Sequence, residues 1–348
     1  MNLTGVYEYK RADDGTWIAR LVAAEGDTLI LPSEHEGIIV SNVRIMSAAK
    51  RKNQITKVVI PSTMSSLSET NFCFLKNLET VEICSGAQII GKKAFANCKR
   101  LKNVILPDTI IDIGVRAFEE CSSIQEIELP HELKKIGSWA FYKCTNISKI
   151  RIPDNVEEIH IQTFSKCDNL EEVHIGKSVK GIVDDSFWSC PKLKKYCVDN
   201  DNKTYKSVDD CIYSKEGEWF MFYPRGRKDE KFEIRDGVEI VFNGAFMECE
   251  SLVEVILPPS VCAIWPGAFN DCKNLKSIDL SHNVSLISKH AFHGCENLES
   301  VSFGPKIWRI DISAFARCKK LKFVEIPSTI EYLDEYAFYD TDCQVILK

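Results

Sequence analysis

The chain has 348 residues, of which 45 % are hydrophobic and 27 % are charged, and its formal net charge at pH 7 is −6. Charges of both signs are interspersed, which argues against a nucleic-acid partner, and no apolar run reaches the length of a membrane-spanning helix. Residues 1–10 lack a basic region followed by an apolar stretch, so no secretory signal is predicted. Both retention in the cytoplasm and export by another route are compatible with this sequence.

A β-hairpin is predicted near the start of the chain. Residues 6–22 contain two extended runs that flank Asp13, Asp14 and Gly15, and Trp17 begins the second run. An Asp-Gly pair between β-prone runs is a strong hairpin signal. We therefore expect residues 1–54 to form a hairpin and a cap over the open end of the structure that follows.

A 23-residue repeat fills most of the remaining chain. Cysteines recur at this interval in two runs, Cys98, Cys121, Cys144, Cys167 and Cys190, then Cys249, Cys272, Cys295 and Cys318. A phenylalanine precedes each cysteine by three residues, at Phe95, Phe118, Phe141, Phe164, Phe187, Phe246, Phe269, Phe292 and Phe315. Two side chains that share one period indicate one structural unit copied many times. We expect these units in residues 55–198 and 238–348.

Each unit follows one pattern, AF-x-x-C-x-x-L-x-x-V-x-I-P, and a second apolar pair completes it. In one copy, Cys121 is followed by Ile124, Ile127, Leu129 and Pro130. The alternation before the proline has the period of a strand with one buried face. Proline ends that strand because it cannot donate a ladder hydrogen bond. The AF-x-x-C segment is too short for a stable helix, and it predicts a turn of 3₁₀ or α-helix.

A unit of this length cannot bury its Phe, Cys and Leu side chains alone, so neighbouring units must stack and share one core. The predicted fold is therefore a solenoid with a curved parallel β-sheet of short strands on its concave face. Turns, including the 3₁₀ or α turns, are expected on the convex side. Length alone would suggest two or three domains, but a stacked array is one unit, and we predict a single domain over residues 1–348.

These elements resemble the BspA-like leucine-rich repeats, whose consensus has the same AF-x-x-C, L-x-x-V-x-I-P and V-x-x-I elements at the same period. The resemblance extends from about Ile55 to Leu347. It implies a leucine-rich repeat horseshoe. It also implies a place on a bacterial or protist cell surface and a role as an adhesin for host matrix proteins or other cells.

The repeat is interrupted between Cys190 and Cys249, and we predict an irregular insertion at residues 199–237. A hairpin is expected there, with strands at residues 211–214 and 219–223, and BspA-like proteins often carry such a degenerate unit. The insertion is rich in aromatic residues, namely Tyr205, Tyr213, Trp219, Phe220, Phe222 and Tyr223. Two interpretations stay open. The aromatic rings fill the core where the regular ladder breaks, or some of them, with Trp219 and Tyr223 as candidates, are exposed and anchor a binding interface.

The sequence contains 15 cysteines, and their regular spacing argues against both disulfides and a metal site. Ladder cysteines on adjacent rungs would lie about 4.8 Å apart, farther than the roughly 3.8 Å between the Cβ atoms of a disulfide. They are expected to be small core side chains. His290, His293 and Cys295 resemble a metal constellation, but Cys295 should point inward and the three should not converge. We predict no metal and no cofactor.

No catalytic motif is found, so the chain is not predicted to be an enzyme, and function is expected from its surface. The outward residues between V and I of successive strands form the candidate binding surface: Glu82, Ile105, Glu128, Arg151, His174, Cys197, Ile256, Asp279, Ser302 and Glu325. No single chemistry repeats along this row, which favours a protein partner over one elongated polymer.

The leading hypothesis is a non-catalytic protein-binding or adhesion scaffold that uses the concave face of the solenoid. The alternative is a purely structural repeat module with no dedicated ligand, which acts through an associated partner. Outward strand residues are polar in any soluble solenoid, so the row marks a candidate surface. The sequence identifies neither the partner nor the oligomeric state.

Overall fold

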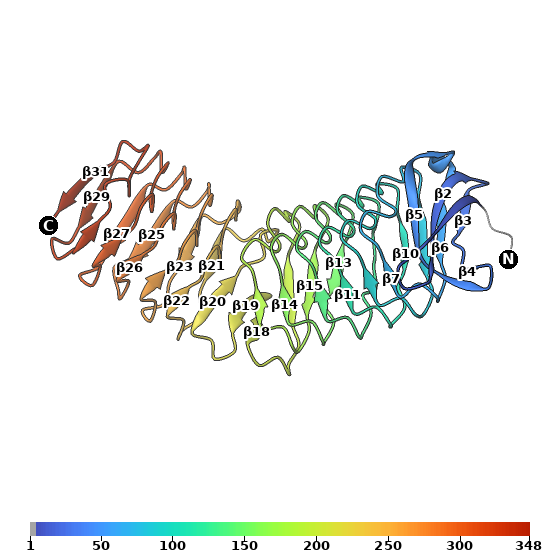
Figure 1. Ribbon diagram of the computed structural model, residues 1–348. Coiled ribbons are helices and arrows are strands. Elements are labelled where there is room, and N and C mark those ends of the chain that lie inside the picture. Colours follow the sequence, from blue (N-terminus) through green and yellow to red (C-terminus); the bar gives the residue numbers. More distant parts are fainter. Residues whose placement is uncertain (1–4) are drawn as a thin grey trace. The chain divides into compact units, whose positions relative to one another are not determined.

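The computed structural model describes residues 5–348, apart from the side chains of residues 46 and 47. It is a β-solenoid of about 14 turns with parallel sheets and almost no helix (Figure 1). This confirms the predicted solenoid of short parallel strands. The chain divides into two compact units, one that ends at Pro191 and one that begins at Lys192, and each is described by itself. That the whole chain acts as one domain stays a prediction.

The first unit begins with a four-stranded sheet in the order β1-β2-β5-β4 (Gly5–Arg11, Trp17–Ala24, Ile38–Lys50 and Glu34–His35). β1 and β2 pair antiparallel, with Lys10 opposite Ile18, which confirms the predicted hairpin. Its turn needs Gly15, whose φ of 83° lies in the left-handed region that glycine adopts without strain. β2 then pairs in parallel with β5, so the hairpin is joined to the chain that follows.

The V-x-I segments of successive repeats form parallel strands, and we call this row of strands the first ladder. In the first unit its strands are β3 (Thr28–Ile30), β6 (Lys57–Ile60), β8 (Thr80–Ile83), β10 (Asn103–Ile105), β13 (Lys149–Arg151) and β15 (Glu172–Ile175). The ladder already begins at Thr28, within the residues predicted to form the cap. The repeat that contains Glu128 forms no strand before its proline, so the prediction of a strand at that place is wrong in this repeat, and the ladder is interrupted between β10 and β13.

The second apolar pair of each repeat forms a two-residue strand, and these strands make the second ladder. In the first unit they are β7 (Ser66–Leu67), β9 (Ile89–Ile90), β11 (Asp112–Ile113), β12 (Lys135–Ile136), β14 (Glu158–Ile159) and β16 (Gly181–Ile182). In each of these strands the second residue is buried, while the first faces outward. The only helix among residues 5–348 is a single 3₁₀ turn, η1 (Lys52–Gln54).

The AF-x-x-C segments are turns, and none of them continues into a helix. In one repeat, the Cys98 amide donates to the Phe95 carbonyl at 3.2 Å, which is an i→i+3 turn. Lys93 and Asn97 have φ values of 56° and 62°, and such left-handed residues interrupt a right-handed helix. The Phe95 amide instead donates to the Ala117 carbonyl of the next repeat at 2.8 Å. Hydrogen bonds between repeats therefore also join the turn side of the solenoid.

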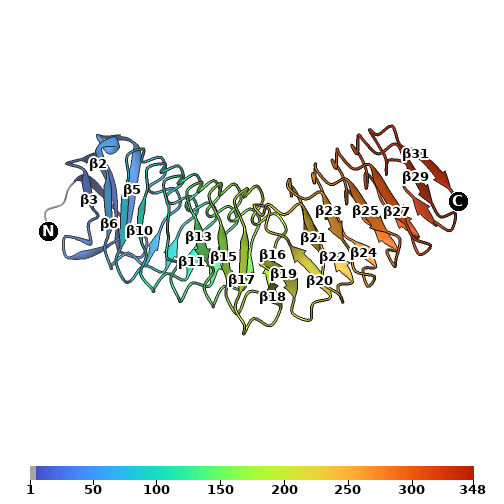
Figure 2. The ribbon, with the colours of Figure 1, turned by 180° about the vertical axis from the view of Figure 1, so that it is seen from behind.

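The second unit begins with β17 (Lys195–Val198) and the irregular insertion. There β18 (Tyr205–Val208), β19 (Cys211–Ser214) and β20 (Trp219–Phe222) pair antiparallel in sequence order, which confirms the predicted hairpin. β20 then pairs in parallel with β22, so the insertion starts the second ladder of this unit (Figure 2). That ladder continues through β22 (Ile240–Val241), β24 (Ala263–Ile264), β26 (Leu286–Ile287), β28 (Arg309–Ile310) and β30 (Tyr332–Leu333).

The first ladder of the second unit lies along the same repeats. Its strands are β21 (Lys231–Glu233), β23 (Glu254–Ile256), β25 (Ser277–Leu280) and β27 (Ser300–Phe303), followed by the pair β29 (Phe323–Ile326) and β31 (Gln344–Leu347). Register is kept from repeat to repeat, since Asp279 lies opposite Ser302 and Glu325 opposite Ile346. Outward residues of successive repeats are therefore neighbours on one face.

The phenylalanine rings form the centre of the core in each unit. From Phe72 to Phe187, consecutive rings stack with centroids 5.2 to 5.7 Å apart. From Phe220 through Phe246 to Phe338, the spacing is 4.7 to 5.1 Å. Phe72 and Phe338 extend the two stacks beyond the repeats that carry the cysteine. Each internal ring is in contact with two others, so its burial depends on both neighbouring repeats.

The ladder cysteines have a role beyond filling space. Eight of them direct the thiol at the carbonyl of a phenylalanine 26 residues earlier, with sulfur–oxygen distances of 2.9 to 3.4 Å. Cys121, for example, donates to the Phe95 carbonyl at 3.1 Å. A buried carbonyl without a hydrogen-bond donor destabilises the folded state. A thiol is a weak donor, and it is small enough to reach such a carbonyl inside the core. All 15 cysteines are free thiols.

We expect the buried ladder thiols to be almost unreactive in the folded protein. Burial raises the pKa of Cys272 to about 12 and raises the pKa of Cys121 and Cys144 well above the usual range, so little thiolate forms at neutral pH. Cys262 is exposed and serves as the internal control. Labelling with a thiol reagent, followed by peptide mapping, should modify Cys262 first, and all cysteines only after denaturation. Rapid native labelling of Cys121 or Cys272 would contradict this prediction.

Candidate binding surface

The first ladder places the predicted outward residues of the first unit in one row. Glu82 lies opposite Ile105, and Arg151 lies opposite His174. The side chain of Ile105 is 54 % exposed, which is high for an aliphatic residue inside a sheet. Glu128 is exposed but belongs to the repeat without a strand. The predicted row is therefore real in this unit, with an interruption at Glu128.

The row in the second unit is equally regular. Asp279 and Ser302 are paired neighbours, and Ile256 lies opposite Glu233, an outward residue that was not predicted. Glu325 lies at the other end of the row, where it forms an ion pair with Lys348. Cys197, in β17, is part of this unit and is partly buried.

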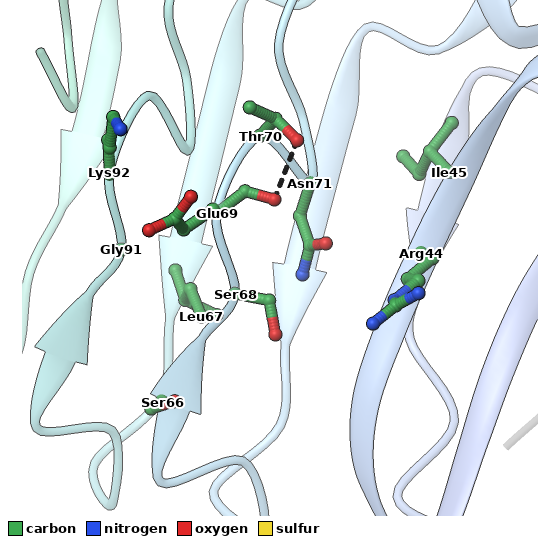
Figure 3. A pocket seen from close by; sticks show the side chains of 10 residues that line it. All are labelled: Arg44, Ile45, Ser66, Leu67, Ser68, Glu69, Thr70, Asn71, Gly91 and Lys92. Carbon is green, nitrogen blue, oxygen red and sulfur yellow. Dashed lines mark hydrogen bonds between the residues drawn. The ribbon is translucent and has the colours of Figure 1, made fainter.

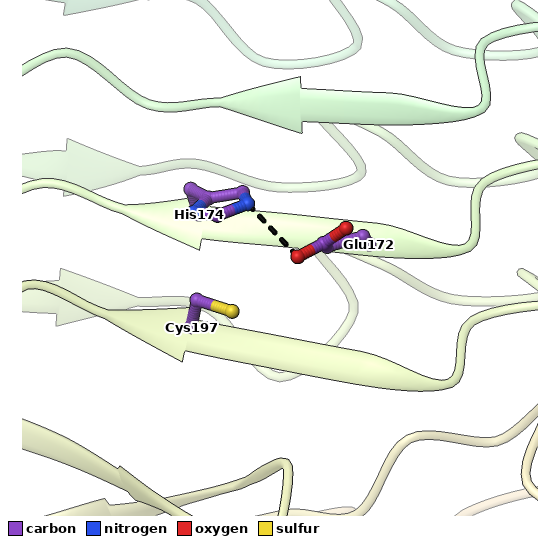
Figure 4. Close-up of side chains that lie close together, drawn as sticks. All are labelled: Glu172, His174 and Cys197. Atoms are coloured by element: carbon purple, nitrogen blue, oxygen red, sulfur yellow. Dashed lines mark ion pairs between the residues drawn. The ribbon is translucent and has the colours of Figure 1, made fainter.

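Ion pairs between repeats occupy part of the row. Glu82 binds Lys57 of the preceding repeat at 2.9 Å. His174 lies with its Nε2 atom 3.0 Å from a carboxylate oxygen of Glu172, two residues earlier on the same strand (Figure 4). In contrast, neither Glu128 nor Arg151 makes an ion pair or a side-chain hydrogen bond with any residue in the range 5–348. These two charges are available to a partner.

A surface hollow of about 750 Å³ lies where the first ladder is interrupted, and Glu128 and Arg151 line it. Its walls include the proline and the following residue of three successive repeats: Pro107, Asp108, Pro130, His131, Pro153 and Asp154. Ile127 and Leu129 add apolar area. The hollow thus combines apolar walls with two unpaired charges of opposite sign, a composition that suits side chains of a protein partner.

Asp154 adds a polar group to this hollow. Its Oδ1 atom is buried and has no hydrogen-bond partner among the described residues, and the nearest cation, Lys177, is 3.7 Å from the carboxylate. Sequence reasoning missed this site. The signal was present, because an acidic residue follows the strand-ending proline at both Asp108 and Asp154, but only the interrupted ladder opens a hollow beside it.

A second hollow, of about 620 Å³, lies between the cap and the first repeats (Figure 3). Arg44 of β5 and Lys92 supply positive charge, and Glu69 supplies negative charge. Asn71 donates a side-chain hydrogen bond to Asn42 at 3.2 Å in the same region. No sequence signal pointed to this hollow, because Arg44 belongs to the cap and has no counterpart in the repeat pattern.

The insertion aromatics are mainly core residues. Tyr223 is 2 % exposed, and its hydroxyl donates to Asp229 at 2.7 Å. Its amide donates to the Ala245 carbonyl, just as the amides of the repeat phenylalanines donate to carbonyls of the following repeat. It occupies the phenylalanine position of a degenerate repeat and is not a surface residue. Trp219 is the exception, with 37 % of its surface exposed. Of the two candidates, only Trp219 can contact a partner.

The two histidines near Cys295 do not form a common site with it. The rings of His290 and His293 lie edge to face with centroids 5.6 Å apart, and His293 is hydrogen-bonded to Asn270 at 3.0 Å. The Cys295 thiol points inward to the Phe269 carbonyl at 3.1 Å. In the part of the chain that the structure describes, these three side chains do not converge on one point.

The pattern of two ladders and a turn per repeat agrees with a known family. The family model described as "BspA type Leucine rich repeat region" matches residues 44–144, 88–215 and 220–344, and it has six copies of the repeat. The chain belongs to the BspA-type leucine-rich repeat family. No curated protein matches it. The family match begins before Ile55, where the sequence resemblance begins, and in the structure the first ladder starts earlier still, at Thr28.

Several solved structures share this BspA-type fold. A leucine-rich cell surface protein from Faecalibacterium prausnitzii is 26 % identical, with 98 % of this chain and 93 % of that chain covered and a TM-score of 0.77. A leucine-rich repeat protein from Bacteroides ovatus is also 26 % identical, with 99 % of each chain covered and a TM-score of 0.61. The pneumococcal vaccine antigen PcpA, at 19 % identity, covers 99 % of this chain and 97 % of its own with a TM-score of 0.61, and it supports the fold alone.

These BspA-type proteins are repeat scaffolds, and this chain is one of them. Within residues 5–348, no helix has the length and apolar character needed to cross a membrane.

Proposed function

We propose that the chain is a non-catalytic, protein-binding scaffold that uses the outward row of the first ladder. The observation that carries this proposal is the hollow at Glu128 and Arg151, where two exposed charges without partners lie beside apolar walls. Elsewhere in the row, Glu82 is already occupied by an ion pair. The hollow is therefore the centre of the proposed interface in the first unit, and Ile105 extends it there. The row of the second unit, with Ile256, Asp279 and Ser302, is a separate candidate surface.

An adhesive role at a cell surface is the specific form of this proposal. The solved structure from F. prausnitzii is described as a cell surface protein, and it covers nearly the whole of this chain. The alternative is a purely structural module, in which unpaired charges in the row would have no role. We favour binding because unpaired charges beside exposed apolar groups are typical of interfaces, in which a partner supplies the missing contacts.

The test begins with the intact chain immobilised and exposed separately to host extracellular-matrix proteins and to lysate of the native cell. A protein retained from either source is then measured against variants. Retention from the matrix proteins would support adhesion, and retention from the lysate alone would support an intracellular scaffold. If neither source yields a protein that binds saturably, the structural module is the correct reading.

Charge reversal in the hollow should weaken binding without unfolding the chain. Glu128→Lys and Arg151→Glu are each expected to lower affinity by about tenfold or more, about 1.4 kcal/mol, because the partner's charge then meets one of like sign. Stability should change by no more than about 0.5 kcal/mol, as for other exposed residues. Asp279→Lys tests the row of the second unit by itself in the same way.

The matched controls are Glu250→Lys and Lys76→Glu, which make the same charge changes on the exposed turn side of the repeats. They should leave both affinity and stability near the wild-type values. Equal losses in the hollow variants and in these controls would show that only net charge matters. Loss confined to Trp219 variants would move the interface to the insertion.

A further inference from the structure

The second ladder of the second unit presents an apolar outward row, which the first-ladder hypothesis does not use. The register places Trp219 opposite Ile240, Ile240 opposite Ala263, and Ala263 opposite Leu286. The row continues through Arg309 to Tyr332. Trp219 is 37 % exposed and Tyr332 is 42 % exposed, while Ile240 and Leu286 are half-buried. Figure 2 shows β20, β22 and β24 side by side.

The same row in the first unit is different, so the fold does not require an apolar face here. The outward positions of its second ladder are Ser66, Ile89, Asp112, Lys135, Glu158 and Gly181. Only Ile89 is a large apolar residue. A repeat protein exposes apolar side chains on one unit at a cost in solubility, and a contiguous exposed apolar patch commonly marks an interaction site.

Two aromatic residues beside this row make it wider. Phe242 and Trp265 follow the second-ladder strands of successive repeats, and both are half-buried. The ring of Trp219 stacks on Phe242 with centroids 5.7 Å apart and an interplanar angle of 17°, and it lies 6.0 Å from Trp265. We call the six residues Trp219, Ile240, Phe242, Trp265, Leu286 and Tyr332 the apolar stripe.

The stacking indicates which class of ligand fits. Sugar rings pack on the open faces of aromatic rings, but one face of Trp219 is already stacked against one face of Phe242. Ile240 and Leu286 add aliphatic groups, and the edges of aromatic rings carry partial positive charge that attracts carbonyl oxygens. Such a surface suits a polypeptide, whose apolar side chains and backbone carbonyls match it, better than a saccharide.

The charges beside the stripe are acidic. Glu218, Glu239 and Glu331 each stand one position before an outward residue of the row, and all three are exposed. None of them forms an ion pair with another described residue. The one cation in the row, Arg309, is held by Asp311 at 2.6 Å and lies over the Tyr332 ring at 4.7 Å. The free charge along the stripe is therefore negative.

We propose that the apolar stripe binds a cationic polypeptide segment in which Lys or Arg residues alternate with apolar ones. The apolar side chains would lie along Trp219, Ile240 and Leu286, and the basic side chains would reach Glu218 and Glu239 at the rim. Charge complementarity selects this occupant over an acidic or neutral segment. The site does not rest on the proposed function of the first ladder, since it involves another face.

The experiment uses the intact chain and a fluorescein-labelled synthetic peptide of alternating Lys, Pro and Leu, followed by fluorescence anisotropy. Three companion probes separate the contributions: the same peptide with Glu in place of Lys, one with Ser in place of Pro and Leu, and a chito-oligosaccharide. We expect saturable binding of the Lys-Pro-Leu peptide, weaker at high salt because exposed charges are screened. Each companion should bind at least about tenfold more weakly, about 1.4 kcal/mol.

Matched variants locate the site. Trp219→Thr should weaken binding of the Lys-Pro-Leu peptide about tenfold, and Tyr332→Ser, tested separately, about threefold. Ile89→Thr, in the corresponding row of the first unit, should leave peptide binding unchanged. Glu218→Gln combined with Glu239→Gln should weaken binding at low salt only, and Glu158→Gln should be neutral. Arg151→Glu should also leave peptide binding unchanged, which separates this site from the first ladder.

Four results of the binding experiments would each overturn the proposal, and so would binding of a second copy in place of the peptide. The four results are no saturable binding of the Lys-Pro-Leu peptide, equal binding of the Glu peptide, stronger binding of the oligosaccharide, or equal effects of Ile89→Thr and the stripe variants. Circular dichroism melts of Trp219→Thr and Tyr332→Ser identify a variant that fails to fold. If one of them does, peptide binding by the other variant tests the proposal. Self-association through the stripe would be seen as a concentration-dependent mass in sedimentation, and binding of a second copy in place of the peptide would also overturn the proposal.

Discussion

Phe141→Ala and Phe269→Ala should each lower the free energy of unfolding by about 3 to 5 kcal/mol. Both rings are fully buried. Phe141 stacks between Phe118 and Phe164 at 5.4 and 5.3 Å, and Phe269 stacks between Phe246 and Phe292 at 4.9 Å on each side. Removing one ring leaves a cavity that two neighbouring repeats line. Urea denaturation followed by circular dichroism measures the loss.

The cavity cannot close easily, and this is why the upper half of the range is expected. The Phe141 amide donates to the Thr163 carbonyl at 2.9 Å, and the Phe269 amide donates to the Ala291 carbonyl at 2.7 Å, so the backbone of each repeat is held to the next. Phe338→Ala is the control. Among the residues that the structure describes, Phe338 stacks on Phe315 alone, and it is half-buried, so its loss should cost less. Wild-type stability in both internal variants would refute the shared-core explanation.

The second large effect is expected at alkaline pH, where the chain should lose stability steeply. Burial raises the pKa of Cys98 and Cys272 from 9.0 to about 12. Between these values the unfolded chain has lost the thiol proton while the folded chain keeps it. The unfolded state then binds fewer protons, so the free energy of unfolding falls as pH rises. The contribution of each thiol is fully present below pH 9 and is lost towards pH 12.

Each such thiol adds a slope of about 1.4 kcal/mol per pH unit within this window. Several buried thiols act together, so cooperative unfolding is expected well before pH 12, the folded pKa of Cys272. The measurement is the free energy of unfolding by urea at a series of pH values, with a reductant present. Cys272→Ala should reduce the slope by about one thiol, whatever its effect on absolute stability. The exposed Cys262→Ala is the control, and identical slopes in the two variants would show that the thiols are not responsible.

The repeat residues were sufficient to predict the architecture. Phe95 and Cys98 recur at one period, and in the structure they occupy equivalent places in successive turns, as the periodicity required. The Asp-Gly turn near Trp17 and the turn between residues 211–214 and 219–223 also predicted real hairpins. These signals are local, since each depends on residues within one repeat or one turn, and local patterns are the most reliable information in a single sequence.

Other features could not be predicted because they depend on the match between repeats. The repeat with Glu128 follows the consensus as well as its neighbours do, yet it forms no first-ladder strand, and this interruption opens the hollow that Arg151 lines. β3 joins the first ladder although its segment lacks the AF-x-x-C signature. Strand pairing is a property of two segments, so it is absent from the pattern of either one.

The sequence by itself determined the period, the parallel stacking, the buried Phe and Cys positions and the row of outward residues, because these follow from which side chains must leave water. Only the tertiary structure decided which outward positions are unpaired, exposed or adjacent. Tyr223 and Trp219 belong to one aromatic segment, but Tyr223 is buried, whereas Trp219 stays 37 % exposed although it stacks on Phe242 of the next repeat. The apolar stripe exists only because register places Trp219 beside Ile240, and Ile240 and Leu286 on either side of the buried Ala263, from segments far apart in the chain.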